Sequence, residues 1–244
     1  MKQHLIAARE LIVPPRGHPH GPLPPMLLAL TVVTGLVDAF SYLELGHVLV
    51  ANMTGNVVFL GFSVADAPGF VWWALLLAVA IFLIGAMSGG RLHTRLGMHR
   101  GRHLFGAVLT QLVLITAAWV TALLIDHPYR EWSLAVLIVF LAAGLGLQNA
   151  TARALAVPDL TTTVLTLTLT GIAADSTAAG GSGSKLGRRL IPVTAMFLGA
   201  AIGATLVVHG HGTATLAVAV LLLAGITVFA YRAARSTQAW TSKP

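Results

Sequence analysis

The chain has 244 residues, of which 56% are hydrophobic and only 9% are charged, and its formal net charge is +7. Soluble domains carry about 25% charged residues, so this chain cannot cover a water-facing surface and is excluded from that class. The basic residues lie in short loops and tails, as in membrane proteins, without a nucleic-acid-binding motif. The absence of Cys excludes disulfides and Cys-zinc sites. Composition therefore predicts a polytopic membrane protein.

Residues 1–25 are basic and rich in proline, and we predict a disordered cytoplasmic tail there. A signal peptide is not expected, because the next apolar run leads directly into further membrane segments. Most of the hydrophobic stretches that follow reach the ~20 residues needed to cross a bilayer. The second is interrupted by polar residues, and the sixth is short and rich in Thr. A second tail occupies 232–244. The eight stretches are approximately 26–45, 47–64, 69–89, 104–125, 132–149, 161–174, 190–209 and 213–231.

The distribution of Lys and Arg favours one topology, because basic residues in short loops prefer the cytoplasm. If all eight stretches cross, ten basic residues lie inside and five outside; a seven-span chain gives eleven and four. If stretches 47–64 and 161–174 enter without crossing, fourteen lie inside and one, Arg130, lies outside. We therefore predict six full spans, two short broken or re-entrant segments, and both termini in the cytoplasm. Trp72, Trp132 and Trp240 are typical of interfacial anchors.

The two weak segments occupy equivalent places in the chain. The sequence around Asp38, Gly-Leu-Val-Asp-Ala, resembles Gly-Leu-Gln-Asn-Ala around Asn149, and a helix with a Gly-xxx-Gly pair follows in each half. The residues of the two pairs are Gly85, Gly89, Gly199 and Gly203. Three crossings per half predict two inverted repeats, 26–125 and 132–231, within one membrane domain, 26–231. Chance similarity between apolar helices is the alternative, and the glycines alone indicate only close helix packing, within one chain or between chains.

A cluster of polar residues inside the first long hydrophobic region is the candidate site. Asp38 is an acid well inside an apolar run, where its charged form is disfavoured, and this suits a proton carrier or a cation ligand. Asn52, Thr54 and Asn56 follow it, and Gly55 would let the backbone open so that these groups converge on a ligand. The structural alternative is that Asp38 and the amides only form hydrogen bonds between helices.

The second half contributes three further candidates, Gln148, Asn149 and Thr166. Asn149 is the counterpart of Asp38, so the site would be asymmetric and contain one titrating group. Thr163, Thr166 and Thr170 form a polar stripe at helical spacing, which is more often structural than not because Thr hydroxyls can bond to the preceding turn. The Leu/Thr alternation there also fits a strand, but an open strand in lipid would leave backbone groups unpaired, and we expect a helix.

Two stretches carry a resemblance to a known family. The segments VTGLVDAFSYLELGHVLVANMTGNVVFLG and AAGLGLQNATARALAVPDLTTTVLTLTLTG resemble the YoaK-like family of bacterial membrane proteins, a domain-of-unknown-function family, over nearly all of 26–231. The resemblance implies a multi-pass bacterial inner-membrane protein and no established reaction, cofactor or substrate. In the second weak segment the family pattern has Thr-Gly where this chain has Thr166-Leu167, so the glycine that would let that segment unwind is missing.

These observations predict an all-α polytopic membrane helix bundle. Its expected function is that of a small-solute or ion transporter, to which Asp38 would add proton coupling. The alternative is a non-transporting membrane module that binds lipid or scaffolds a partner, with structural buried polar groups. No catalytic motif or paired intramembrane acids are present, so we expect no enzyme activity, cofactor or metal. The expected partners are membrane lipids and an unidentified small solute or ion, not nucleic acid. A homo-oligomer through the Gly85/Gly89 or Gly199/Gly203 faces is left open.

Overall fold

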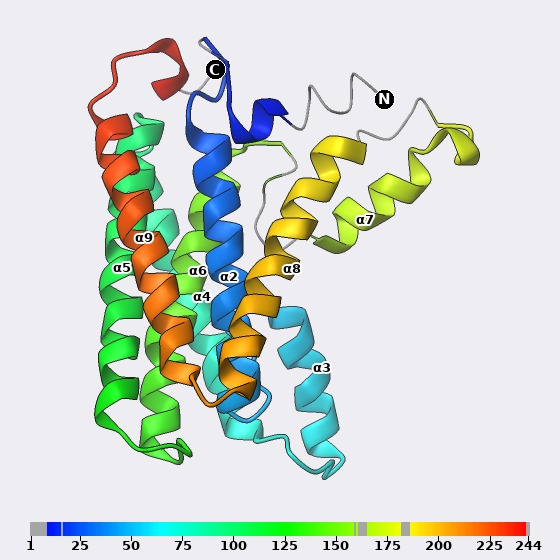
Figure 1. The fold of residues 1–244 in the computed structure, drawn as a ribbon, viewed down its shortest axis with the longest axis vertical. Helices are drawn as coiled ribbons and strands as arrows, with labels where there is room; N and C mark the ends of the chain where they lie inside the picture. The colour runs from blue at the N-terminus through cyan, green and yellow to red at the C-terminus, as the bar shows by residue number, and fades with distance from the viewer. Residues whose placement is uncertain (1–8, 16, 159, 161–164, 182–185, 243–244) are drawn as a thin grey trace.

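In a computed structural model the chain forms a bundle of helices (Figure 1). The structure describes residues 9–15, 17–158, 160, 165–181 and 186–242. Among these, six helices are long and apolar enough to cross a membrane. The predicted all-α bundle with six spans is therefore confirmed. The six helices are α2 (Leu23–Glu44), α4 (Trp72–Leu96), α5 (Arg100–Leu124), α6 (Trp132–Leu155), α8 (Leu186–Val208) and α9 (Gly212–Ala234).

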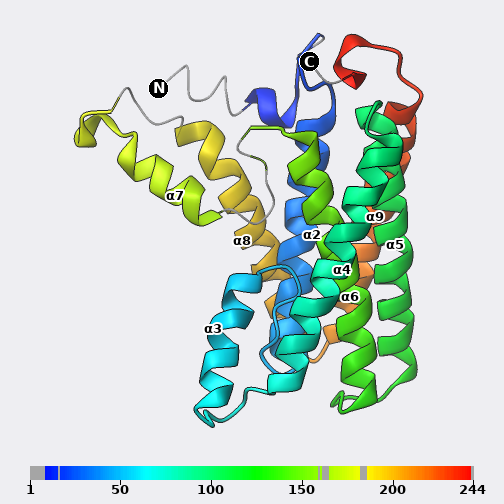
Figure 2. The same ribbon diagram turned by 180° about the vertical axis from the view of Figure 1, so that it is seen from behind.

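Two shorter helices correspond to the two weak segments of the sequence. Helix α3 (Met53–Val64) has 12 residues and α7 (Leu165–Ala174) has 10. At about 1.5 Å per residue, both are much shorter than a ~30 Å hydrocarbon core. Helix α3 lies at one end of the bundle and α7 at the other, both to the side of its axis (Figure 2). The predicted helix in the Leu/Thr stretch is confirmed, whereas Thr163 lies outside the described residues.

The first helix begins earlier than the hydropathy pattern suggested. Pro24 and Pro25 lie in the first turn of α2, where a missing backbone N–H removes no helical hydrogen bond. Upstream, Leu11 is buried in the hydrophobic core with only 2% of its surface exposed. Most of the other described residues before α2 are exposed, so Leu11 is an isolated point of contact with the bundle, and the disordered tail stays a prediction.

Helices α2 and α6 form the centre of the bundle. In their most apolar windows 72% and 61% of the residues are buried, compared with 17–33% in the other four spanning helices. Helix α2 packs mainly on α8 and helix α6 mainly on α4, while α5 and α9 pack on each other. The two central helices therefore each have a close partner among the Gly-xxx-Gly helices.

Glycines permit these two close crossings. A Cβ added at Gly199 would lie 2.2 Å from the carbonyl oxygen of Val32, and one added at Gly146 would lie 2.1 Å from that of Phe82. Gly203 and Gly85 approach the opposing backbones similarly, at Leu36 and Ala143. Both Gly-xxx-Gly faces are thus covered by helices of the same chain. Homo-oligomerisation stays a prediction, and it would have to use other surfaces.

The ends of the bundle differ in charge. At one end, the Arg100 side chain donates to the backbone of Leu155, and the His99 ring contacts the Ser236 carbonyl oxygen at 2.9 Å. The start of α5, the end of α6 and the segment after α9 therefore meet there, together with the Arg-rich end of α4. At the other end Glu44 pairs with His127 at 2.5 Å, and Arg130 lies in the same loop as His127.

The C-terminal segment folds back onto the bundle. The short 3-10 helix η2 (Ala239–Thr241) contains Trp240, which is only 7% exposed. Its ring packs so closely against Gly21 that a Cβ there would lie 2.4 Å from Trp240. Trp240 is thus covered by the chain before α2, and its role as an interfacial anchor stays a prediction. Trp72 and Trp132 remain 60% and 64% exposed.

Candidate functional site

The segment between α2 and α3 folds back along α2. Gly46 (φ 73°) and His47 (φ 61°) take the left-handed conformation that ends the helix and turns the chain. Residues 48–52, which we call the strap, are then non-helical, and the side chains of Val48 and Val50 are fully buried. Burial of non-helical backbone requires hydrogen-bond partners for its N–H and C=O groups.

Asp38, on α2, supplies hydrogen-bond acceptors for the N–H groups of the strap. Its Oδ1 accepts hydrogen bonds from the backbone N–H groups of Val50 and Ala51, each at 2.9 Å, and its Oδ2 accepts one from the Asn52 side-chain amide. Asp38 is 5% exposed and lies six residues, about 9 Å along the helix, before the end of α2 at Glu44. The carboxyl group thus accepts three hydrogen bonds from the strap.

Asn56 secures the strap from its other side. Its Oδ1 accepts from the Leu49 N–H at 2.9 Å, and its Nδ2 donates to the Leu49 carbonyl oxygen at 2.5 Å. The Asn56 side chain is fully buried. The Asn56 amide thus pairs with both the N–H and the C=O group of Leu49, as the backbone of a neighbouring β-strand would. Asp38, Asn52 and Asn56, all predicted from the sequence, therefore meet around one short piece of backbone.

The other two candidates of this segment have different places. Gly55 lies in the first turn of α3, which begins at Met53, and it does not open the backbone as expected. A Cβ at Gly55 would lie 2.6 Å from Leu49, so the glycine instead allows the strap to approach α3. The chain opens before Asn52 because the left-handed turn after α2 precedes it. Thr54 is exposed and contributes no hydrogen bond to this cluster.

Gln148 belongs to a second polar cluster. Its Oε1 accepts from Gln111 Nε2 at 2.6 Å, and its Nε2 donates to Thr34 Oγ1 at 2.7 Å. These three side chains, which join α5, α6 and α2, are each at most 2% exposed. Thr34 precedes Asp38 by four residues, so the two clusters lie one turn apart on the same face of α2.

Sequence reasoning missed Gln111 and Thr34. A single Gln in the apolar run of α5 was the available signal, because an amide there needs a partner. Asn149 donates to the Leu145 carbonyl oxygen of its own helix at 3.1 Å, and Thr166 lies exposed on α7. The structure thus brings Asp38, Asn52 and Asn56 together, places Gln148 one turn away, and leaves Thr54 and Thr166 outside the cluster.

Three hydrogen bonds link the Asp38 carboxyl to the strap. A carboxylate has lone pairs for all three donors of the strap, whereas a protonated carboxyl offers fewer acceptor sites and becomes a donor itself. Within the described residues, the positions around the Asp38 carboxyl are filled by the backbone of 50–52 and the Asn52 amide. A ligand could reach it only if the strap moved.

Comparison with known proteins is consistent with this architecture. The UPF0700 transmembrane protein YoaK of Bacillus subtilis (strain 168) is 30% identical over 151 residues, which cover 62% of this chain and 65% of that relative. No solved structure matches the chain. The profile of the family described as "Protein of unknown function (DUF1275)" matches residues 26–229, from the first turns of α2 almost to the end of α9. This multi-pass membrane protein therefore belongs to the DUF1275 family.

Proposed function

We propose that the chain is a small-solute or ion transporter of the bacterial inner membrane, with no enzyme activity, in which proton binding at Asp38 controls release of the strap. The observation that carries the proposal is the set of three hydrogen bonds from the strap to one buried carboxyl. An ionisable residue in a spanning helix is expensive, and such residues commonly mark ion or substrate pathways. Here the acid holds the non-helical segment that closes the site.

The proposed cycle begins with protonation of Asp38. Hydrogen bonds to a charged acceptor contribute about 1.5–3 kcal/mol each, compared with about 0.5–1.5 kcal/mol for neutral pairs. Neutralising Asp38 therefore weakens the strap where it contacts α2. Its release would expose Asp38 and the amides of Asn52 and Asn56 toward the end of the bundle at which α3 lies. A solute with hydrogen-bonding groups, or a cation after proton loss, would then occupy the vacated space.

Packing of the two halves supports an alternating-access mechanism. Helix α2 is the first spanning helix of the first half, and it packs on the Gly-xxx-Gly helix α8 of the second half. Helix α6 is the first spanning helix of the second half, and it packs on the Gly-xxx-Gly helix α4 of the first half. Helices α3 and α7 lie at opposite ends of the bundle, as inverted repeats 26–125 and 132–231 require (Figure 2). Rocking of one half against the other would open the site to alternate sides. Asn149, at the position equivalent to Asp38, would leave a single titrating group.

A specific observation favours a second candidate, a non-transporting membrane module that binds lipid or a partner protein. The polar groups of Asp38 and Asn56 already have partners within the chain, and both side chains are almost fully buried. For groups that already have hydrogen-bond partners, a purely structural role in holding the fold together is sufficient. The two candidates differ in whether the Asp38 carboxyl becomes accessible in a bilayer.

Labelling with the apolar reagent dicyclohexylcarbodiimide, which modifies accessible protonated carboxyls, tests this difference. In native membrane vesicles at pH 6 we expect Asp38 to be modified, as read by mass spectrometry of the peptide, because the strap opens on protonation. Asn56→Ala, which frees Leu49, should raise the labelling rate several-fold. A proteoliposome assay with the lumenal pH dye pyranine then screens cations, amino acids and nucleobases for proton flux that Asp38→Asn abolishes. An Asp38 that stays unmodified, while the detergent-unfolded chain reacts, would establish the non-transporting alternative.

Charge at the two ends predicts the orientation in the membrane. Because the Arg-rich connection between α4 and α5 meets the ends of α6 and α9, we expect that end, with both termini, to face the cytoplasm. Alkaline phosphatase fused after Arg102 should be inactive, and the same fusion after Arg130 should be active. If the two fusions had the opposite activities, the orientation in the membrane would be the reverse of the one proposed. If both were active, α5 would not cross the membrane, which would contradict the six-span topology.

A further inference from the structure

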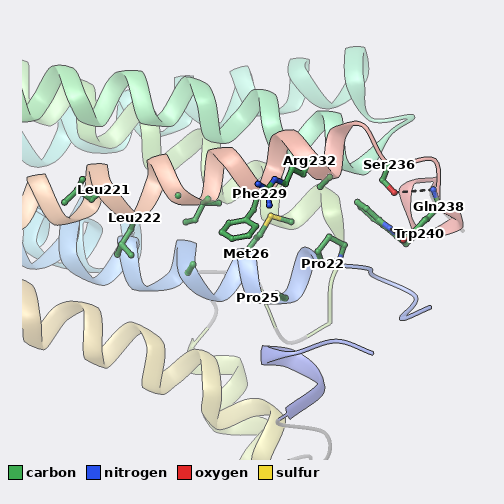
Figure 3. Close-up of a pocket in the computed structure, with 14 residues that line it drawn as sticks. Pro22, Pro25, Met26, Leu221, Leu222, Phe229, Arg232, Ser236, Gln238 and Trp240 are labelled. Atoms are coloured by element: carbon green, nitrogen blue, oxygen red, sulfur yellow. Dashed lines mark hydrogen bonds between the residues drawn. The ribbon is translucent and has the colours of Figure 1, made fainter. Parts of the chain in front are cut away.

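An open groove lies between α2 and α9, away from the Asp38 cluster. Its volume is about 620 Å³, within the range of ~300–1,000 Å³ that is common for small-molecule sites. Its lining is mainly apolar and includes Met26, Leu222 and Phe229 (Figure 3). Gly225 of α9 leaves the space free, since a Cβ there would meet nothing within 4 Å. The groove opens toward lipid, because Phe229 on its rim is 61% exposed.

A second cavity adjoins this groove at the end of the bundle rich in Arg. It has a volume of about 460 Å³ and shares Gln238 and Trp240 with the groove. Its lining includes the ionisable side chains of His18, His20 and Arg100, next to apolar surface from Pro19 and Trp240. Trp240 lines both spaces, and Figure 3 shows it at one end of the groove. Together the two spaces fit a molecule with an apolar tail and a polar head.

The buried charge of Arg100 in this second cavity favours an anionic head group. Arg100 is only 4% exposed, and its Nη2 donates to the Leu155 carbonyl oxygen at 2.6 Å and lies 3.0 Å from His20 Nδ1. Its Nε has no hydrogen-bond partner, and within the part of the chain that the structure describes no carboxylate pairs with it. An unpaired buried charge is costly, so the cavity favours an anion.

Three neighbouring features add to this preference. Arg100 begins the 25-residue helix α5, whose N-terminus carries a partial positive charge. Burial and, after it, the nearby charge of Arg100 lower the pKa of His20. Arg232 lies at the same end of the groove, with its guanidinium 6.0 Å from the centre of the Phe229 ring.

We infer that the groove and the cavity together bind one anionic phospholipid, with an acyl chain between α2 and α9 and the phosphate beside Arg100. The occupant follows from the combination of the two spaces: a free phosphate would leave the apolar groove empty, and a neutral lipid would leave the Arg100 charge without a counter-ion. Basic pockets between spanning helices on the cytoplasmic side commonly bind lipid head groups. This inference is independent of transport, since the Asp38 cluster contributes no residue to either space.

Thermal unfolding and native mass spectrometry of the purified full chain in a neutral detergent test the lipid and its source. We expect dioleoylphosphatidylglycerol to bind in a one-to-one complex and to raise the unfolding midpoint by several degrees. Dioleoylphosphatidylcholine should bind about tenfold more weakly, because its choline cation offsets the phosphate charge and reduces the net attraction to Arg100. Inorganic phosphate should give no shift. Equal effects of the two lipids, or an equal shift with phosphate alone, would overturn the inference.

Two pairs of variants locate the site. Gly225→Leu places a side chain in the groove without a backbone clash and should reduce phosphatidylglycerol binding at least about tenfold. Gly90→Leu, at a glycine of α4 with equally open surroundings, is the matched control and should bind normally. Arg100→Gln retains a donor for Leu155 but removes the charge, and should weaken binding more than Arg102→Gln at an exposed position. Unchanged binding by Gly225→Leu, which has no reason to unfold, would contradict the proposed acyl site.

Discussion

Replacing Asp38 by Ala should lower the free energy of unfolding by about 3–6 kcal/mol. The substitution leaves the buried N–H groups of Val50 and Ala51 without an acceptor, and each unsatisfied buried donor costs about 1–3 kcal/mol. The bond from Asn52 is lost as well. Asp38→Asn keeps one acceptor oxygen but brings an amide against the Asn52 amide, so roughly half of the loss is expected.

The measurement combines unfolding with a local probe of the strap. Reversible SDS titration in mixed micelles would report the free energy, and hydrogen exchange would report the Val50 and Ala51 amides. In Asp38→Ala these two amides should exchange much faster than in the wild type, while amides of α5 and α9 change only as global stability does. Glu44→Ala, an acid at the end of the same helix paired with His127, is the control and should leave strap exchange unaltered. Slow exchange of both amides in Asp38→Ala would show that the carboxyl does not hold the strap.

Replacing Gly146 by Ala should destabilise the fold by up to about 2 kcal/mol, although alanine is the better helix former. The new Cβ would lie 2.1 Å from the Phe82 carbonyl oxygen and 3.0 Å from the Ala86 nitrogen, which are backbone atoms that cannot rotate away. Helices α4 and α6 would have to separate, and in a membrane the van der Waals packing between close helices is a main source of their association. Overpacking of this kind costs about 1–3 kcal/mol or more, which exceeds the ~1 kcal/mol gained in helix propensity.

The control substitution should change the stability of the fold in the opposite direction. Gly90→Ala, on α4, meets no atom within 4 Å and should stabilise the protein by up to ~1 kcal/mol through helix propensity alone. Thermal midpoints of the two variants, measured in the same detergent, should therefore move in opposite directions from the wild type. If Gly146→Ala were as stable as Gly90→Ala, the close crossing of α4 and α6 would not exist in the folded protein.

The site itself was predicted only in part, and the residues show why. Asp38, Asn52 and Asn56 were recognisable because polar side chains in an apolar run are costly and need partners. Their actual partners were not, since most of them are backbone groups of Leu49, Val50 and Ala51. A backbone N–H is the same at every non-proline residue and leaves no mark in the sequence. The opening of the chain was assigned to Gly55, whereas it follows the left-handed turn at Gly46 and His47.

A multi-pass membrane protein with six long and two short helices could be predicted from the amino-acid sequence alone. The lengths of apolar runs decide which segments can cross a bilayer, and that property is local along the chain. The three-dimensional fold was needed to see that α2 packs on α8 and α6 on α4, that Gln148 joins Gln111 to Thr34, and that Trp240 is buried. Those contacts join residues far apart in the chain, and many apolar helix faces resemble one another. The partner of each face is therefore set by the close fit of side chains and backbones in three dimensions.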